Sequence, residues 1–193
     1  MTPMFIQTEP TPNPATLKFL PGRDVTGGAP RDFASLEEAQ VASPLAAELL
    51  QIEGVERVFL GSDFVSVSKA EGRDWAHLKP SILAAIMDHY IAGGPAIAAG
   101  GVASGHTAHA YEGEAAATVE KIKELLDARV RPAVAADGGD IVFESYDVES
   151  GVVRLHMRGA CSGCPSSTMT LKSGIENLFR HYLPEVRGVE AAL

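Results

Sequence analysis

Short stretches of alternating hydrophobic and polar residues mark the first half of this 193-residue chain, a pattern typical of half-buried β-strands. Two further stretches have the spacing of helices. One is capped by Ser43, has Pro44 at its first position and ends at Gly54, and the other begins near Pro80 and ends at Gly93. The expected order is β-β-α-β-β-α, with strands over residues 4–9, 16–20, 55–61 and 64–70.

The second half opens with a longer helical pattern over residues 114–136. Its apolar residues fall on one face, and Pro132 is expected to kink or end the helix. Gly138-Gly139 then turns the chain into two strands joined at 149–151. A helix and a last strand follow, so that the expected order is α-β-β-α-β, with these elements over residues 140–148, 151–159, 165–183 and 185–193.

A change in composition separates the two halves. Residues 93–113 are rich in Gly, Ala and Ser, carry almost no charge and show no sustained period, which is typical of a flexible linker. The predicted fold class is therefore α+β, with two small α/β-sandwich domains over residues 1–92 and 114–193. The first contains no cysteine and no obvious catalytic cluster.

Charge and hydropathy exclude several classes of protein. The net charge of −9 gives no overall basic footprint for nucleic acid, and no apolar run reaches the length needed to span a membrane. The first ten residues have neither a basic region followed by an apolar one nor the composition of a transit peptide. From these residues we expect a bacterial cytoplasmic protein.

The chain has only two cysteines, Cys161 and Cys164, in the stretch GACSGCPSS. A disulfide between them would close a very short loop and stabilise little, so the pair is expected to serve chemistry. Cys161 follows a strand and Cys164 precedes a helix, whose N-terminus favours thiolates, and thiolates bind soft metals. Residues 150–175 contain no Asp or Glu but carry Arg154 and Arg158, which suits an anionic group there.

Two thiolates cannot complete a four-ligand metal site. His156 and His181 are the in-domain candidates for further ligands, but His181 is more than three helical turns from Cys164. A second copy of the chain could instead supply two more cysteines across a two-fold axis. A bridging iron–sulfur cluster is the favoured interpretation, and a thiol–disulfide redox enzyme and a zinc-bridged dimer are the alternatives.

Residues 114–192, which include DGGDIVF and GACSGCPSS, resemble the C-terminal domain of the NifU family, the Nfu-type iron–sulfur scaffolds. The opening FIQTEPTPNPATLKFLPG resembles the N-terminal domain of mitochondrial and alphaproteobacterial-type Nfu proteins. This implies that residues 1–92, which have no cysteine, serve partner recognition rather than cluster ligation. The resemblance implies a scaffold or carrier, not an enzyme, that holds a [4Fe-4S] cluster through Cys161 and Cys164. It also implies that two subunits share the cluster. An upstream assembly scaffold would be the donor of the cluster and apo iron–sulfur proteins its acceptors, and the role would be general maturation of iron–sulfur proteins rather than nitrogen fixation.

Overall fold

A computed structural model describes residues 5–98, 111–162 and 165–192; the side chains of 165–167 are not described. The chain divides into two compact units, Met1–Ser104 and Gly105–Leu193. Each unit is described by itself. Among the described residues, no helix combines the length and the apolar character that crossing a bilayer requires.

The first unit is built on a five-stranded antiparallel sheet with the order β1-β2-β5-β4-β3. The central strand β5 pairs through Val65 with Phe19 on one side and Leu60 on the other. Its strands are β1 (Gln7–Pro10), β2 (Thr16–Leu20), β3 (Arg31–Phe33), β4 (Val55–Leu60) and β5 (Val65–Lys69).

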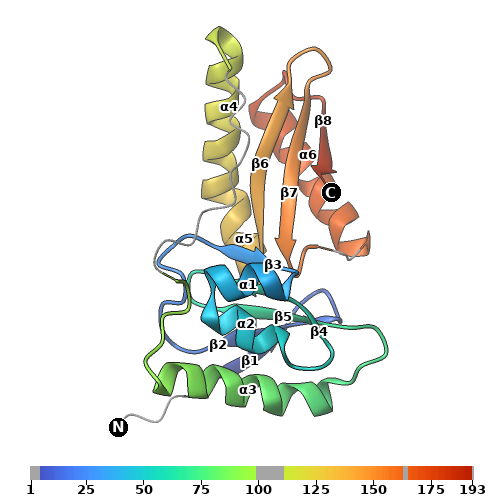
Figure 1. Ribbon diagram of the computed structural model, residues 1–193. Coiled ribbons are helices and arrows are strands. Elements are labelled where there is room, and N and C mark those ends of the chain that lie inside the picture. The colour runs from blue at the N-terminus through green and yellow to red at the C-terminus, as the bar shows by residue number, and fades with distance from the viewer. Residues whose placement is uncertain (1–4, 99–110, 163–164, 193) are drawn as a thin grey trace. The chain divides into compact units, whose positions relative to one another are not determined.

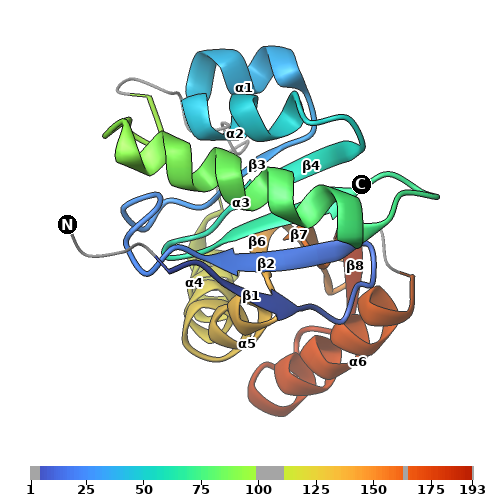
Figure 2. The same ribbon diagram turned by 90° about the horizontal axis from the view of Figure 1, so that it is seen from below.

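Three helices cover one face of this sheet: α1 (Leu36–Ala42), α2 (Pro44–Leu50) and α3 (Trp75–Ile91). Ser43 ends α1 and begins α2, and its hydroxyl oxygen accepts the Ala46 N–H at 3.0 Å. The Asp74 carboxylate caps α3 in the same way. Figure 2 shows α2 running beside α3 over the sheet.

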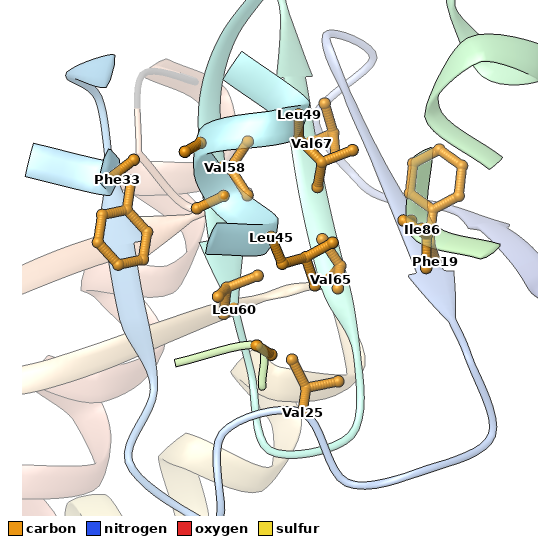
Figure 3. Close-up of a cluster of buried hydrophobic side chains, with 14 of the residues drawn as sticks. Phe19, Val25, Phe33, Leu45, Leu49, Val58, Leu60, Val65, Val67 and Ile86 are labelled. Atoms are coloured by element: carbon orange, nitrogen blue, oxygen red, sulfur yellow. The ribbon is translucent and has the colours of Figure 1, made fainter. Parts of the chain in front are cut away.

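Side chains of the sheet and the helices meet in one hydrophobic core. Figure 3 shows Phe19 of β2 near Ile86 of α3, and Leu45 of α2 near Val65 of β5. These four side chains are fully buried. Burial of each large apolar side chain contributes about 1.5–3 kcal/mol, so this core stabilises the first unit without any metal or disulfide.

The second unit is built on a three-stranded sheet with the order β6-β7-β8, in which β6 and β7 are antiparallel and β7 and β8 are parallel. Figure 1 shows α4 beside β6 and α6 beside β8, and both helices contribute to one core. The elements are α4 (Gly113–Leu125), η1 (Leu126–Val130), α5 (Arg131–Ala136), β6 (Gly139–Asp147), β7 (Val152–Gly159), α6 (Pro165–Tyr182) and β8 (Gly188–Ala192).

A π-helical turn, η1, joins α4 to α5 without ending the helix. In it the Arg131 N–H donates to the Leu126 carbonyl, five residues back. Pro132 follows at once, and it has no N–H and clashes with the carbonyl four residues before it. The π-turn absorbs this clash, so that the predicted break at Pro132 becomes a local widening instead of an end.

The α+β class is confirmed, and the sequence pattern located most elements. It missed β3, which has three residues, and α1, whose N-cap Ser35 makes no side-chain cap hydrogen bond. The expected order β-β-α-β-β-α is therefore β-β-β-α-α-β-β-α in the structure. Short elements of this kind are fixed by tertiary contacts, here between β3 and β4 and between α1 and α2.

The predicted limits of the domains stay predictions, since the boundary between the two units falls among residues 99–110, outside the described ranges. Both described ends of the predicted linker 93–113 are packed. Ala96 is buried, and its carbonyl accepts the Ser43 hydroxyl. Tyr111 packs its ring against Phe143 of β6.

Candidate metal centre at the cysteine loop

Cys161 lies two residues after the end of β7, in the connection to α6. Its side chain is 6% exposed and belongs to the hydrophobic core of the second unit. Cys164, the second predicted ligand, lies outside the described residues. The structure turns the Cys161 thiol inward, toward this core.

The chain turns sharply as it leaves β7. Gly159 adopts a left-handed conformation with φ of 63°, which favours glycine. The Ser162 N–H then donates to the Gly159 carbonyl at 3.0 Å, and the Thr168 hydroxyl of α6 donates to the Cys161 carbonyl at 3.4 Å. The backbone around Cys161 is thus tied to the end of β7 and to the first turns of α6.

The start of β6 forms the surface against which the Cys161 thiol packs. A β-carbon on Gly139 would lie 2.7 Å from Cys161 Sγ and 2.7 Å from the Arg158 carbonyl oxygen. Such distances are too short for real side chains, so only glycine fits at this position. The Ala160 N–H also donates to the Gly138 carbonyl at 3.2 Å, which holds the cysteine loop to the Gly-Gly pair.

Asp140, the next residue of β6, is a buried carboxylate whose side chain is 6% exposed. Arg131 binds it through two bonds, with Nε to Oδ1 at 2.8 Å and Nη2 to Oδ2 at 3.1 Å. The same guanidinium reaches Asp127 in the π-turn at 3.0 Å. The hydrogen bond to Asp140, and more weakly the one to Asp127, raises the pKa of Arg131 above its usual range.

The two candidate histidines do not join this arrangement. His156 lies on β7 between the buried residues Leu155 and Met157, so its side chain is on the opposite face of the sheet from the core that contains Cys161. His181 lies near the C-terminal end of α6, where its ring contacts Tyr182. Within residues 5–98, 111–162 and 165–192, no three His, Cys, Asp or Glu side chains are placed to hold a metal ion.

The basic character of residues 150–175 is moderated by acidic residues from the neighbouring strands. Arg154 lies 3.5 Å from Glu190 of β8, and Arg158 is directly opposite Asp140 of β6. The charge of a stretch of sequence is therefore not the charge of the site that it forms. Asp140 itself is already bound by Arg131.

Sequence reasoning missed the contribution of Gly139, Asp140 and Arg131 to the surroundings of Cys161. A signal was present in the two consecutive glycines at the start of the predicted strand, because glycine in a strand often marks a close approach by another part of the chain. Only the pairing of Gly139 with Gly159 shows that these residues lie beside the cysteine loop.

Two family models match the chain. "Scaffold protein Nfu/NifU N terminal" matches residues 6–93, and "NifU-like domain" matches residues 122–190. The chain is 51% identical over 187 residues to "NifU-like protein 4, mitochondrial" of Arabidopsis thaliana, covering 97% of this chain and 65% of that protein. It is 49% identical to "NifU-like protein 5, mitochondrial" of the same plant, with 97% and 67% covered.

A third relative is "NFU1 iron-sulfur cluster scaffold homolog, mitochondrial" of Drosophila willistoni, 50% identical over 97% of this chain and 63% of that protein. This chain thus spans about two thirds of the length of these relatives. A solution structure of a NifU-like protein from Saccharomyces cerevisiae is 29% identical, with a TM-score of 0.44 over 49% of this chain and 85% of that one. Of these three relatives the Drosophila protein is named for a scaffold role and none is named as an enzyme, in line with the non-enzymatic expectation.

The expected bacterial cytoplasmic location is wrong. The relatives named above are mitochondrial, and they point to a mitochondrial protein instead. The expectation rested on the composition of the first ten residues. Since these relatives are longer than this chain, that composition does not reveal the compartment.

Proposed function

Since the chain belongs to the NifU-like (Nfu) family of iron–sulfur cluster scaffold proteins, we propose that Cys161 and Cys164 bind an iron–sulfur cluster that is passed to apo-proteins. The cluster is cargo, and the thiolates are the soft donors that iron–sulfur clusters take from proteins. The observation that carries the proposal is the cysteine count: two in the whole chain, both within the NifU-like domain.

The finer proposal is a [4Fe-4S] cluster bridged between two copies of the chain. Each copy supplies two thiolates, and a two-fold axis brings the number to four. The described residues are consistent with this count, because among them no three His, Cys, Asp or Glu side chains are placed to hold a metal ion within one copy. Binding of the cluster then drives association of the two copies, since an incomplete site in each becomes complete only in the dimer.

Transfer proceeds by thiolate exchange. A thiolate of the acceptor forms a bond to iron as a cysteine of this chain leaves as thiolate, so the oxidation state of the cluster does not change. In the structure Cys161 is buried, so loading of the cluster requires its thiol to leave the core. We propose that an upstream assembly scaffold loads the site, and that the N-terminal domain, residues 1–92, recognises partners and is joined to the cluster-binding domain through residues 93–113.

Anaerobic reconstitution with iron and sulfide tests the function. We expect about four iron and four sulfide per two chains, with a mass in solution that doubles on loading. Each variant, Cys161→Ser and Cys164→Ser, removes two of the four ligands and should abolish stable binding. A loaded species that stays monomeric, or either single variant with the iron content of the parent, would contradict the bridged site.

Controls separate the two other classes of function. Metal analysis of freshly isolated protein detects a zinc-bridged dimer, which would carry zinc and no sulfide. A thiol–disulfide redox enzyme would gain no broad visible absorbance on reconstitution. An apo-acceptor assay then measures transfer, with release of the cluster to buffer as the reference rate.

A further inference from the structure

One arginine on the helical segment of the second unit is connected to Cys161 by a continuous series of contacts. Arg131 begins α5, directly after the π-turn, and binds the buried Asp140 carboxylate through two hydrogen bonds. A paired guanidinium and carboxylate with two parallel bonds fixes both distance and orientation. Arg131 therefore determines where the start of β6 lies against the helix.

The start of β6 is also held by its pairing with β7 and by the bond from the Ala160 N–H to the Gly138 carbonyl. β6 is an edge strand that pairs only with β7, and Gly138 and Gly139 have no side chains with which to pack. Cys161 Sγ and the Arg158 carbonyl occupy the space where a Gly139 side chain would lie. Any displacement of Gly139 thus moves the surface against which the Cys161 thiol packs.

The other end of the connection is anchored in the helix. The Arg131 guanidinium also binds Asp127 at 3.0 Å, within the π-turn that Pro132 imposes. Arg131 thereby joins three places: the π-turn, the first residues of β6 and, through Gly139, the cysteine loop. We call Arg131, Asp140 and Asp127 the arginine clamp.

We propose that Arg131 is a positioning residue for Cys161, which acts through Asp140 and Gly139 to hold the thiol in the core until a cluster is loaded. The inference rests on the proposed function of Cys161 as a cluster ligand. Arg131 itself does not touch the cargo. Its loss leaves the Asp140 carboxylate buried without its guanidinium, and this favours arrangements in which the start of β6 moves away from the cysteine loop.

The first experiment uses the full chain without a cluster. In a Cys164→Ser background, Cys161 is the only thiol, and its rate of alkylation by iodoacetamide reports how often it leaves the core. We expect Arg131→Gln and Asp140→Asn to raise this rate about tenfold, since a broken buried pair promotes local opening. Arg131→Lys keeps the charge but loses the two-bond geometry, so it should give an intermediate rate.

Two controls distinguish positioning from general loss of stability. Arg180→Gln removes another arginine–carboxylate pair of the same unit, with Glu176 on α6. Val189→Ala creates a small cavity at a fully buried position on β8, away from the clamp. Thermal unfolding of each variant establishes that the domain is folded. Both controls should be alkylated at the rate of the parent, whereas equal acceleration in Val189→Ala would overturn the inference.

The second experiment loads the chain with both cysteines present. Arg131→Gln and Asp140→Asn should take up the cluster about tenfold faster than the parent, because loading requires the Cys161 thiol to leave the core, and Arg131→Lys should give an intermediate rate. Rates of alkylation and uptake equal to those of the parent would overturn the proposal, as would faster alkylation with an unchanged rate of uptake. If the parent binds no cluster, the proposed function fails, and alkylation alone still decides whether the clamp holds Cys161.

Discussion

The two units use the same arrangement, helices against one face of a sheet, but they differ in how the central strand is held and in what the core contains. In the first unit, β5 lies in the middle of five antiparallel strands. In the second, both neighbours of β7 are edge strands, and one of them pairs in parallel. Both cores are built from buried apolar side chains, but only the second includes a thiol, that of Cys161.

This difference shows how a reactive group is accommodated in a small core. A buried cysteine behaves as a small apolar side chain, so it costs little in packing. Its place is provided by glycine: Gly139 leaves the space that Sγ occupies. In the second unit, the edge strand β6 therefore has a glycine, Gly139, in place of a larger side chain. The ion pair between Arg131 and Asp140 lies beside this glycine.

Separating the units gives the largest expected effect. Residues 111–193 expressed alone should fold and bind a cluster, because every proposed ligand and the complete second core lie there. Residues 1–98 alone should fold and bind none, since they contain no cysteine. Reconstitution and iron analysis of both fragments test this. A folded second fragment that takes up no cluster would mean that the first unit contributes to the site.

Cavities in the two cores should have different consequences. Ile82→Ala in the first core and Phe179→Ala in the second each remove a fully buried side chain and should cost about 3–4 kcal/mol in unfolding free energy. Only Phe179→Ala should shorten retention of the cluster. Chemical denaturation and chelator release measure the two quantities. Faster release from Ile82→Ala would show that the units do not function separately.

The glycine beneath the thiol gives a smaller, local effect. Gly139→Ala places a β-carbon against Cys161 Sγ and the Arg158 carbonyl and should cost about 1–3 kcal/mol through overpacking. Gly174→Ala on α6 is the matched control, because nothing lies within 4 Å of its added carbon. That change should stabilise the unit by about 0.5–1 kcal/mol through helix propensity. Thermal unfolding measures both changes. If the unfolding temperatures of the two variants shift in the same direction, the contact between Gly139 and Cys161 is contradicted.

The start of the second unit can be tested at Tyr111. Its hydroxyl accepts the Tyr146 N–H at 2.7 Å, and its ring lies edge-on to Phe143 at 6.4 Å between centroids. Tyr111→Phe should cost about 1 kcal/mol, because it removes the hydrogen bond and keeps the ring contact. Tyr182→Phe, at a half-exposed ring, serves as the control. A stability unchanged by Tyr111→Phe would mean that residue 111 belongs to the linker.

The turn between β6 and β7 gives the smallest effect. Hydrogen bonds lower the pKa of the Asp147 carboxyl from 3.8. The largest contribution is the bond from the Ser150 side chain, and the backbone N–H groups of Glu149 and Ser150 contribute less. The stabilisation is present above the unfolded-state pKa and is lost as pH falls through the lower folded-state value. Asp147→Asn should remove this pH dependence of thermal unfolding, whereas Glu149→Gln should keep it. If Asp147→Asn unfolds with the same pH dependence as the parent, Asp147 is not the group responsible.

The sequence predicted those elements that have a strong period or clear punctuation. The apolar face of α4 and the alternation in β7 each specify an element, and so does the Ser43-Pro44 start of α2. The three residues of β3 have no such period. They become a strand because β4 offers an edge to pair with, which is a contact between residues far apart in the chain.

The site was predicted only as far as its motif. Spacing identified Cys161 and Cys164, but burial of the Cys161 thiol depends on Gly139, which is 22 positions away and becomes a neighbour through the β6–β7 register. The π-turn is likewise invisible to a helical pattern, because Pro132 predicts either a kink or an end. Local rules find the ligands, whereas the way they are held depends on tertiary pairing.

The parallel pairing of β8 with β7 has a consequence for the order of events during synthesis. β8 follows every other element of the second unit in sequence, so its residues complete the sheet of that unit. The first unit can fold while the second is still being made. Until β8 has been made and docks, β7 has an open edge, and the sheet that leads to the cysteine loop is incomplete. A chain truncated after Arg187 tests this: we expect it to retain a folded first unit and to acquire no cluster.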